Sequence, residues 1–188
     1  FLSRDAFNWM KRQIQYLKNP AQMIRGIKNE RHRYVNKNNL GINSNFLIGG
    51  LYFFAYNPKL KDDLPYYDMF PLVIPLQRYP DGFLGLNLHY LPIQYRLIFL
   101  NKLKNFAIYN DEDEIKRFRV TYDILNASRR LREFRPCVKR YLNTHIKSRV
   151  LSVAHDEWDV ALYLPVHQFR KENASTVWQE SVETIRNS

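Results

Sequence analysis

The stretch GFLGLNLHYLP, from Gly82 to Pro92, combines glycines with a histidine, and both residue types are common in nucleotide-binding and catalytic sites. A dinucleotide-binding loop needs G-x-G-x-x-G between a strand and a helix, whereas Gly82 and Gly85 are three residues apart in an apolar run. The alternating pattern predicts a strand instead. We therefore interpret His89 as a packed or hydrogen-bonded residue, and Gly85 as a bulge or a close backbone crossing.

The other residues that could do chemistry form no recognisable metal or nucleophile motif. Neither i, i+4 nor His-x-His spacing occurs among His32, His145, His155 and His167, and Cys137 is the single cysteine. No serine lies in a G-x-S-x-G sequence. These patterns predict a protein that is not an enzyme and has no metal, no cofactor and no small-molecule substrate.

One enzymatic alternative comes from the acidic run before a helical pattern. Asp111, Glu114 and Lys116 superficially resemble the acidic and E-x-K parts of a metal-dependent nuclease. That chemistry requires the acids and the lysine to converge on a metal from adjacent strands. Acidic residues at this place also stabilise the N-terminus of a helix, which is the simpler interpretation.

Positive charge is concentrated in two parts of the chain. The net charge is +11, and residues 1–47 carry +7 and residues 93–153 carry +8, while residues 48–92 are nearly neutral. This distribution favours a polyanion or an acidic partner. The densest segment is ASRRLREFRPCVKRYLNTHIKSRV, whose cations are Arg129, Arg130, Arg132, Arg135, Lys139, Arg140, Lys147 and Arg149.

Cations spaced this closely repel one another unless a counter-charge is supplied. A helix predicted from Pro136 would place Arg140, Asn143 and Lys147 on one outer face, suited to phosphates or carboxylates. We therefore predict that these cations bind a polyanion or an acidic partner. An ordinary solvated face is the alternative.

Two apolar groups are the predicted subunit-docking sites. The first is a stripe on an N-terminal amphipathic helix, formed by Phe7, Met10, Ile14 and Leu17 and followed by a basic extended arm. The second is the cluster Tyr66, Tyr67 and Phe70 in a predicted loop. That cluster either marks a protein contact or folds back to cap a small barrel, and the sequence leaves both open.

Short aromatic and β-branched runs predict the strands of a small antiparallel sheet. They are LYFFAYN (51–57), MFPLVIPLQRY (69–79) and GFLGLNLHYL (82–91). Pro71 and Pro75 cannot donate ladder hydrogen bonds, so the second strand should lie at an edge or carry a bulge. Asp81-Gly82 predicts a tight hairpin.

After Pro92 the pattern becomes helical. Ile93, Leu97, Leu100 and Leu103 share one face of the first predicted helix. Further helices are predicted after the acidic run, from Pro136, and over TVWQESVETIRN, where Thr176 and Gln179 have capping-box spacing. EWDVALYLP fits a short helix or a strand. No apolar run is long enough to span a bilayer, so no membrane insertion is expected.

Several motifs in a fixed order resemble a family of small virion-associated proteins of T-even-like contractile-tailed phages. They are LYFFAYNPK, LPYYDMFPLVIPL, DGFLGLNLHYLP, FRPCVKRYL and EWDVALYLPVHQF, and they cover most of residues 50–170. Members of this family are virion structural proteins, and some are named DNA-end protector. The resemblance implies a phage protein and brings no catalytic residues.

The expected fold class is α+β, with a small antiparallel SH3-like β-barrel, an N-terminal helical arm and several C-terminal helices. The expected organisation is a basic helix and arm over 1–45 and one domain over 46–188, with the barrel at about 48–92 and a helical part at about 93–188.

We expect a non-enzymatic structural component of a tailed-phage virion, in the tail, baseplate or neck. Its partners would be other virion subunits, on which the basic N-terminal arm docks, and it would occupy the virion and, during assembly, the host cytoplasm. The alternative is a protein that binds duplex DNA and protects packaged genome ends.

Overall fold

The computed structural model describes residues 8, 12, 39–40, 48–108, 129–153 and 157–188. Its main feature is an antiparallel sheet of six described strands in the order β1-β7-β2-β4-β5-β6. In that order the strands span Asn39–Leu40, Val150–Val153, Leu51–Phe53, Leu72–Tyr79, Gly82–Asn87 and Val138–Leu142. The α+β class is confirmed. The predicted barrel is not, because β1 and β6 do not pair with each other in the described part of the chain.

The β4–β5 hairpin confirms several predictions from the sequence. Tyr79 pairs with Gly82, so the turn between the strands is tight. β4 is a central strand, and its register shifts between Pro75 and Gln77, as a proline-containing strand requires. Gly85 pairs with Pro75, and a Cβ at Gly85 would lie 2.4 Å from Cγ1 of Val73. The run from Gly82 is therefore a strand whose glycine permits a close approach.

Side-chain alternation gives the sheet two apolar faces. One face contributes Leu51, Phe53, Leu72, Ile74 and Leu86 to a core that also contains helical residues. The opposite face holds an aromatic cluster of Tyr52, Phe54, Tyr56, Val73, Phe83, Tyr141, Ile146 and Val150. Both clusters are buried, whereas residues 77–79 at the end of β4 are exposed.

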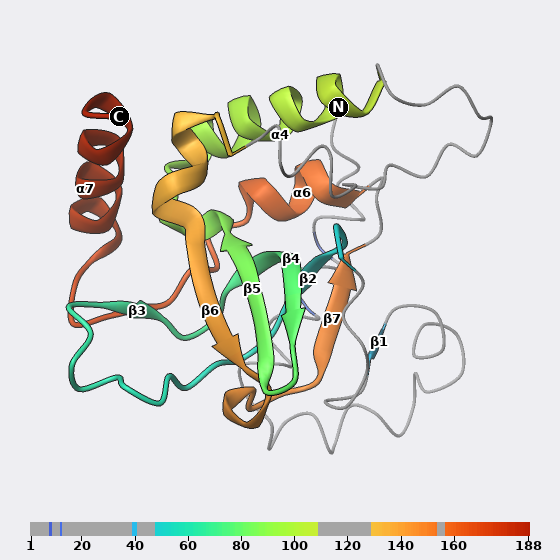
Figure 1. The fold of residues 1–188 in the computed structure, drawn as a ribbon, viewed down its shortest axis with the longest axis vertical. Helices are drawn as coiled ribbons and strands as arrows, with labels where there is room; N and C mark the ends of the chain where they lie inside the picture. The colour runs from blue at the N-terminus through green and yellow to red at the C-terminus, as the bar shows by residue number, and fades with distance from the viewer. Residues whose placement is uncertain (1–7, 9–11, 13–38, 41–47, 109–128, 154–156) are drawn as a thin grey trace.

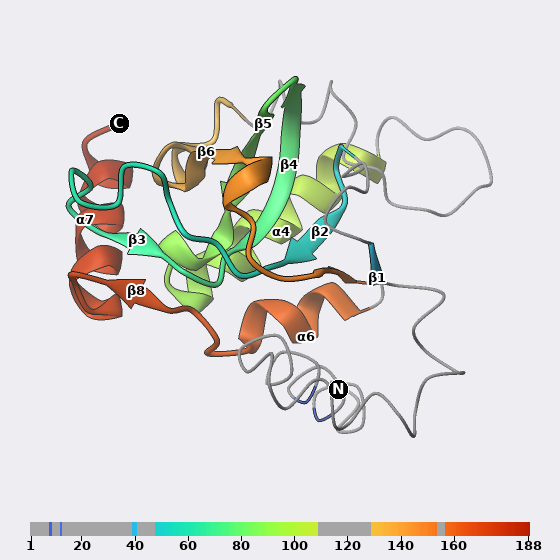
Figure 2. The ribbon, with the colours of Figure 1, turned by 90° about the horizontal axis from the view of Figure 1, so that it is seen from below.

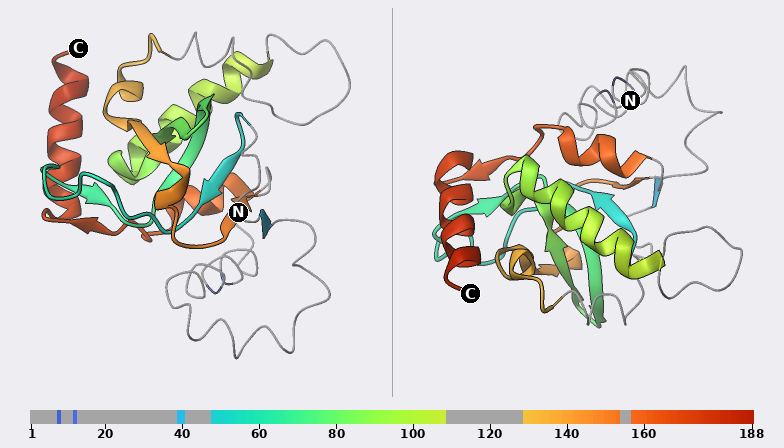
Figure 3. Two further views of the ribbon diagram at one scale, coloured as in Figure 1. Left: turned by 60° about the horizontal axis from the view of Figure 1, so that its bottom comes forward. Right: turned by 90° about the horizontal axis from the view of Figure 1, so that it is seen from above.

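Helices α4 (Ile93–Ile108) and α6 (Trp158–Tyr163) lie together on the first face of the sheet (Figures 1 and 3). α4 begins directly after Pro92, whose carbonyl accepts a hydrogen bond from the N–H of Arg96 at 3.1 Å. Its buried face contains Arg96, Phe99, Leu100 and Leu103, whereas the predicted members Ile93 and Leu97 are half-buried. The segment EWDVALYLP, which the sequence left open, forms α6.

The C-terminal helix α7 (Ala174–Arg186) stands beside the 3-10 helix η2 (Arg132–Cys137) and a two-stranded ribbon of β3 (Tyr67–Asp68) with β8 (Phe169–Arg170), as Figures 1 and 2 show. Its N-cap is Asn173, whose Oδ1 accepts from the N–H of Thr176 at 2.9 Å. The predicted cap at Thr176 is wrong, because Asn173 is the stronger cap and begins the helix earlier.

The helix predicted from Pro136 is also wrong. Pro136 lies inside η2, and the next residues form strand β6, which pairs with β5 at the end of the described sheet. Tyr141 stacks on its cross-strand partner Phe83 with ring centres 5.3 Å apart. A short 3-10 helix, η3 (Asn143–His145), follows β6, and η1 (Leu88–Tyr90) follows β5. Pairing with β5 therefore overrides the helical spacing of residues 138–142. As a result, the part of the chain expected to be helical, about 93–188, also contains strands.

Candidate functional site

The predicted cation-binding residues lie on η2, on β6 and around η3, rather than on one helix face. Arg129 and Arg130 occupy the turn before η2, Arg132 and Arg135 lie on η2, and Arg149 lies immediately before β7. All five side chains are exposed. None of them forms an ion pair with a carboxylate in the described part of the chain. Their guanidinium groups are therefore exposed, and none of the described acids supplies them with a counter-charge.

The other cations of the set are held by the protein itself. Arg140 forms an ion pair with Asp81 and lies 4.3 Å from the centre of the Tyr79 ring. It also donates to the carbonyl of Tyr141 at 2.8 Å. Lys147 is exposed, and its Nζ donates to the carbonyl of Thr144 at 3.1 Å. The described residues thus divide the predicted site into exposed arginines without a carboxylate partner and cations with internal partners.

Lys139 differs from the rest because it points into a pocket. Its Nζ lies 4.1 Å from the centre of the Tyr90 ring, in a cation–π contact. Burial lowers the pKa of Lys139 below its ordinary value. No carboxylate pairs with this ammonium among the described residues.

The pocket has a volume of about 490 Å³ and lies between residues 56–68, β6 and the end of β5 with η1. Its lining contains the tyrosines Tyr56, Tyr66, Tyr67, Tyr90 and Tyr141, and the cations Lys59, Lys139 and Arg140. Aromatic rings next to cations suit a ligand that has a planar ring and a negative charge. No local pattern in the sequence indicates this pocket, because its walls come from segments far apart in the chain. For example, the N–H of Leu142 donates to the hydroxyl of Tyr56, 86 residues away.

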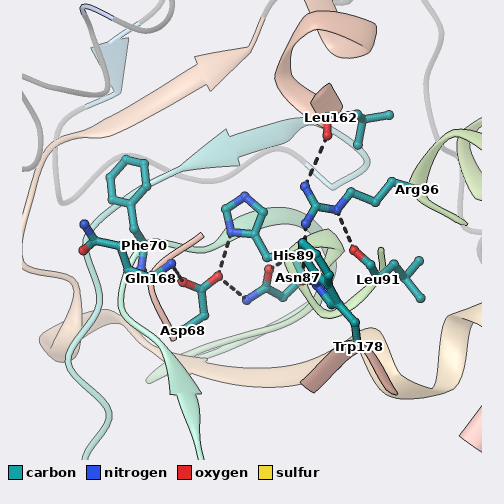
Figure 4. Close-up of polar contacts among 9 residues, drawn as sticks. All are labelled: Asp68, Phe70, Asn87, His89, Leu91, Arg96, Leu162, Gln168 and Trp178. Atoms are coloured by element: carbon teal, nitrogen blue, oxygen red, sulfur yellow. Dashed lines mark hydrogen bonds and ion pairs between the residues drawn. The ribbon is translucent and has the colours of Figure 1, made fainter. Parts of the chain in front are cut away.

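Asp68 lines the same pocket, but its carboxylate is fully engaged in a buried network (Figure 4). Oδ2 lies 2.7 Å from Nδ1 of His89 and accepts from Asn87 at 3.2 Å. Oδ1 accepts from the backbone N–H groups of Phe70 and Gln168, each at 3.0 Å. Burial alone would raise the pKa of Asp68, but the charge and hydrogen bond of His89 and the backbone donors together hold it below its ordinary value. The predicted structural role of His89 is therefore confirmed.

Arg96 is a fully buried cation that holds the helices to this network (Figure 4). Its guanidinium donates to the carbonyls of Leu91 at 2.7 Å, Leu162 at 3.2 Å and His89 at 3.4 Å. The His89 carbonyl also accepts from Nε1 of Trp178 at 2.8 Å. Burial lowers the pKa of Arg96 to about 10. The sequence showed Arg96 only as one cation of a basic block.

The two predicted docking groups have different outcomes. Phe70 is 1% exposed and stacks on Phe53, so it belongs to the core and presents no surface to a partner. Tyr66 and Tyr67 are half-buried, and the Tyr66 hydroxyl donates to Oε2 of Glu180 at 2.7 Å. Tyr66 and Tyr67 thus contact the domain, and docking on a partner subunit through these two residues stays a prediction. Docking by Phe7, Met10, Ile14 and Leu17 stays a prediction, since these residues lie outside the described residues.

The nuclease alternative is not tested, because Asp111, Glu114 and Lys116 lie outside the described residues. Where side chains are described, no group of three or more His, Cys, Asp or Glu residues could hold a metal ion. The single cysteine, Cys137, is buried, and burial raises its pKa to about 12. None of the described helices is long and apolar enough to cross a membrane.

These features define a basic α+β protein with exposed arginines on its surface and an aromatic, cation-lined pocket on the adjoining strand β6. The chain belongs to the family of the phage T4 terminal DNA protecting protein, whose family model matches residues 29–181. The resemblance found in the sequence is thereby confirmed. No curated protein and no solved structure matches the chain.

Proposed function

We propose that this protein binds the ends of phage DNA and shields them without catalysing a reaction. Membership of a family named for terminal DNA protection supports this function over the tail or baseplate role expected first. The observation that carries it is a set of five exposed arginines that have no carboxylate partner in the described part of the chain: Arg129, Arg130, Arg132, Arg135 and Arg149.

Arginine is well suited to phosphate because its planar guanidinium presents several donors in a fixed fork. A cation already paired with a carboxylate must give up that partner before it binds DNA. The five exposed arginines have no such partner among the described acids, so their contacts would release counterions from the DNA without breaking a described ion pair. Arg140, which is paired with Asp81, should contribute less than its unpaired neighbours.

The test is protection of linear duplex DNA from an exonuclease by the purified protein. We expect digestion from the ends to slow in proportion to the bound fraction, and we expect affinity for the duplex to fall steeply as salt rises. Each phosphate contact contributes a slope of about 0.9 log units of affinity per log unit of salt. Absence of duplex binding at low salt would overturn the proposal and favour an acidic protein as the partner of these arginines.

We infer a place in the virion as the second part of the function, because a protein bound to the end of a packaged genome is carried in the particle. Docking on neighbouring subunits through the N-terminal arm would hold it there. Mass spectrometry of purified particles should detect the chain at a low and constant copy number. Loss of the protein from particles after extensive purification would count against this second part.

A further inference from the structure

The pocket beside β6 has no role in the DNA binding that we propose for the exposed arginines. It is formed where strand β6 meets residues 56–68, and two of its cations, Lys139 and Arg140, are neighbours on that strand. Arg132 and Arg135 lie on η2, which runs directly into β6 at Val138. A DNA molecule held by the arginines would therefore lie near the mouth of the pocket.

Lys139 gives the pocket its chemical preference. Lys139 is half-buried, its ammonium rests on the Tyr90 ring, and it has no carboxylate partner among the described residues. Leaving a cation in such a place is costly unless an anion completes the site. Asp68 is the one acid in the described lining, and His89, Asn87 and two backbone N–H groups already satisfy its carboxylate. Among the described residues of the lining no other acid is present to complete the site, which leaves room for a bound anion.

We propose that this pocket takes the terminal nucleotide of a DNA strand, with its phosphate at Lys139 and its base against Tyr66 and Tyr67, the half-buried tyrosines of the lining. The assignment depends on the end-binding function proposed above, and it names the part of the protein that distinguishes an end from the interior of a duplex. The lining also contains Lys59 and Arg140, whose charges would attract an adjacent phosphate.

The size and lining of the pocket fit one nucleotide. Pockets for small ligands usually enclose about 300–1,000 Å³, and this pocket of about 490 Å³ is too small for a paired duplex. Tyrosine rings stack on any base, because every base has a π-face, so the site would be indifferent to sequence. An interior nucleotide cannot enter unless its base pair breaks and the backbone bends on both sides of it. A terminal nucleotide is linked to the backbone on one side only, so less distortion is needed.

The experiment compares two duplexes of the same sequence, one with open ends and one closed at both ends by hairpin loops. We expect wild-type protein to prefer the open duplex. Lys139→Met keeps the aliphatic stem but removes the charge, and it should lower affinity for the open duplex by about 10-fold, within the range of single stacking or phosphate contacts. Affinity for the closed duplex should stay unchanged.

Three further variants make the result interpretable. Lys139→Arg should restore the preference for open ends if charge is what matters. Lys59→Gln removes an exposed cation from the mouth and should weaken the preference without affecting folding. Arg186→Gln on α7 is the charge-matched control outside the pocket and should leave the preference intact.

The experiment distinguishes failure of the end-binding function from failure of the pocket assignment alone. Equal binding of open and closed duplex by the wild-type protein would overturn the end-binding function and the pocket assignment with it. A clear preference for open ends that survives in both Lys139→Met and Lys59→Gln would overturn only the pocket. Loss of the preference in both variants, with rescue by Lys139→Arg, supports the assignment.

Discussion

Nδ1 of His89 lies 2.7 Å from Oδ2 of Asp68, and neither side chain is exposed by more than 1%. Because Asp68 is on β3 and His89 is on η1, this contact fixes the ribbon to the end of β5. Asp68 also lines the cationic pocket, but its carboxylate already has its hydrogen-bond partners. A buried ion pair of this kind is held by geometry and further hydrogen bonds, and removal of one partner is more costly than replacement of both.

We expect Asp68→Asn to lower the free energy of unfolding by about 3 kcal/mol, because it removes the charge of a buried pair and leaves His89 without its carboxylate. Urea denaturation measures this loss. Asp63→Asn, at an exposed position, is the control and should change the free energy by less than about 0.5 kcal/mol. An equal effect of the two substitutions would contradict a stabilising role for the network.

The same pair predicts a pH dependence of stability. The pKa of Asp68 is lower in the folded protein than its ordinary value of about 3.9. The unfolded chain therefore binds the proton more tightly, and the contribution of Asp68 is fully present above about pH 4 and is lost as pH falls through the folded pKa. Unfolding free energies measured between about pH 6 and pH 3 should fall more steeply for wild type than for Asp68→Asn. Parallel curves would show that Asp68 is not responsible.

Gly85→Ala should destabilise the protein by about 1–3 kcal/mol, since the new Cβ would lie 2.4 Å from Cγ1 of Val73. The clash involves a side chain, so it can be removed. In a Val73→Ala background the cost of Gly85→Ala should shrink, and a double-mutant cycle by chemical denaturation measures the coupling. Purely additive effects would mean that strain in the backbone, rather than this contact, is what glycine avoids.

Arg96→Lys should be nearly as destabilising as Arg96→Met, with a loss of about 3 kcal/mol or more in each case. One ammonium cannot reproduce the guanidinium hydrogen bonds to the carbonyls of Leu91, Leu162 and His89, and those acceptors would stay buried. Thermal and urea unfolding of the two variants provide the comparison. Near wild-type stability of the lysine variant would show that charge, and not the fork of donors, is required.

The exposed arginines predict a graded change in salt dependence. If Arg132 and Arg135 each contact a phosphate, each substitution to Gln should reduce the slope of log affinity against log salt by about 0.9. Arg140→Gln should have a smaller effect, because Arg140 is paired with Asp81. Titrations of a labelled duplex at several salt concentrations measure the slopes. Equal effects at Arg132 and Arg140 would show that the internal pair does not restrain binding.

Local patterns in the sequence were sufficient for β4, β5, the hairpin between them and α4. Alternating apolar residues, prolines and the Asp81-Gly82 turn act within a few residues, so their consequences can be read without knowledge of the rest of the chain. The bulge in β4 and the close approach at Gly85 followed from the same local chemistry. The family resemblance also came from the order of the motifs alone, and the family model confirms it.

The tertiary structure decided what local patterns could not. Residues 138–142 have helical spacing but form β6, because β5 offers an open row of backbone donors and acceptors that no helix could satisfy. The same pairing turns Lys139 into the pocket and pairs Arg140 with Asp81, and so separates cations that look equivalent in the sequence. Composition fixes how many charges a chain carries, whereas long-range pairing of strands determines which of those charges remain available to a ligand.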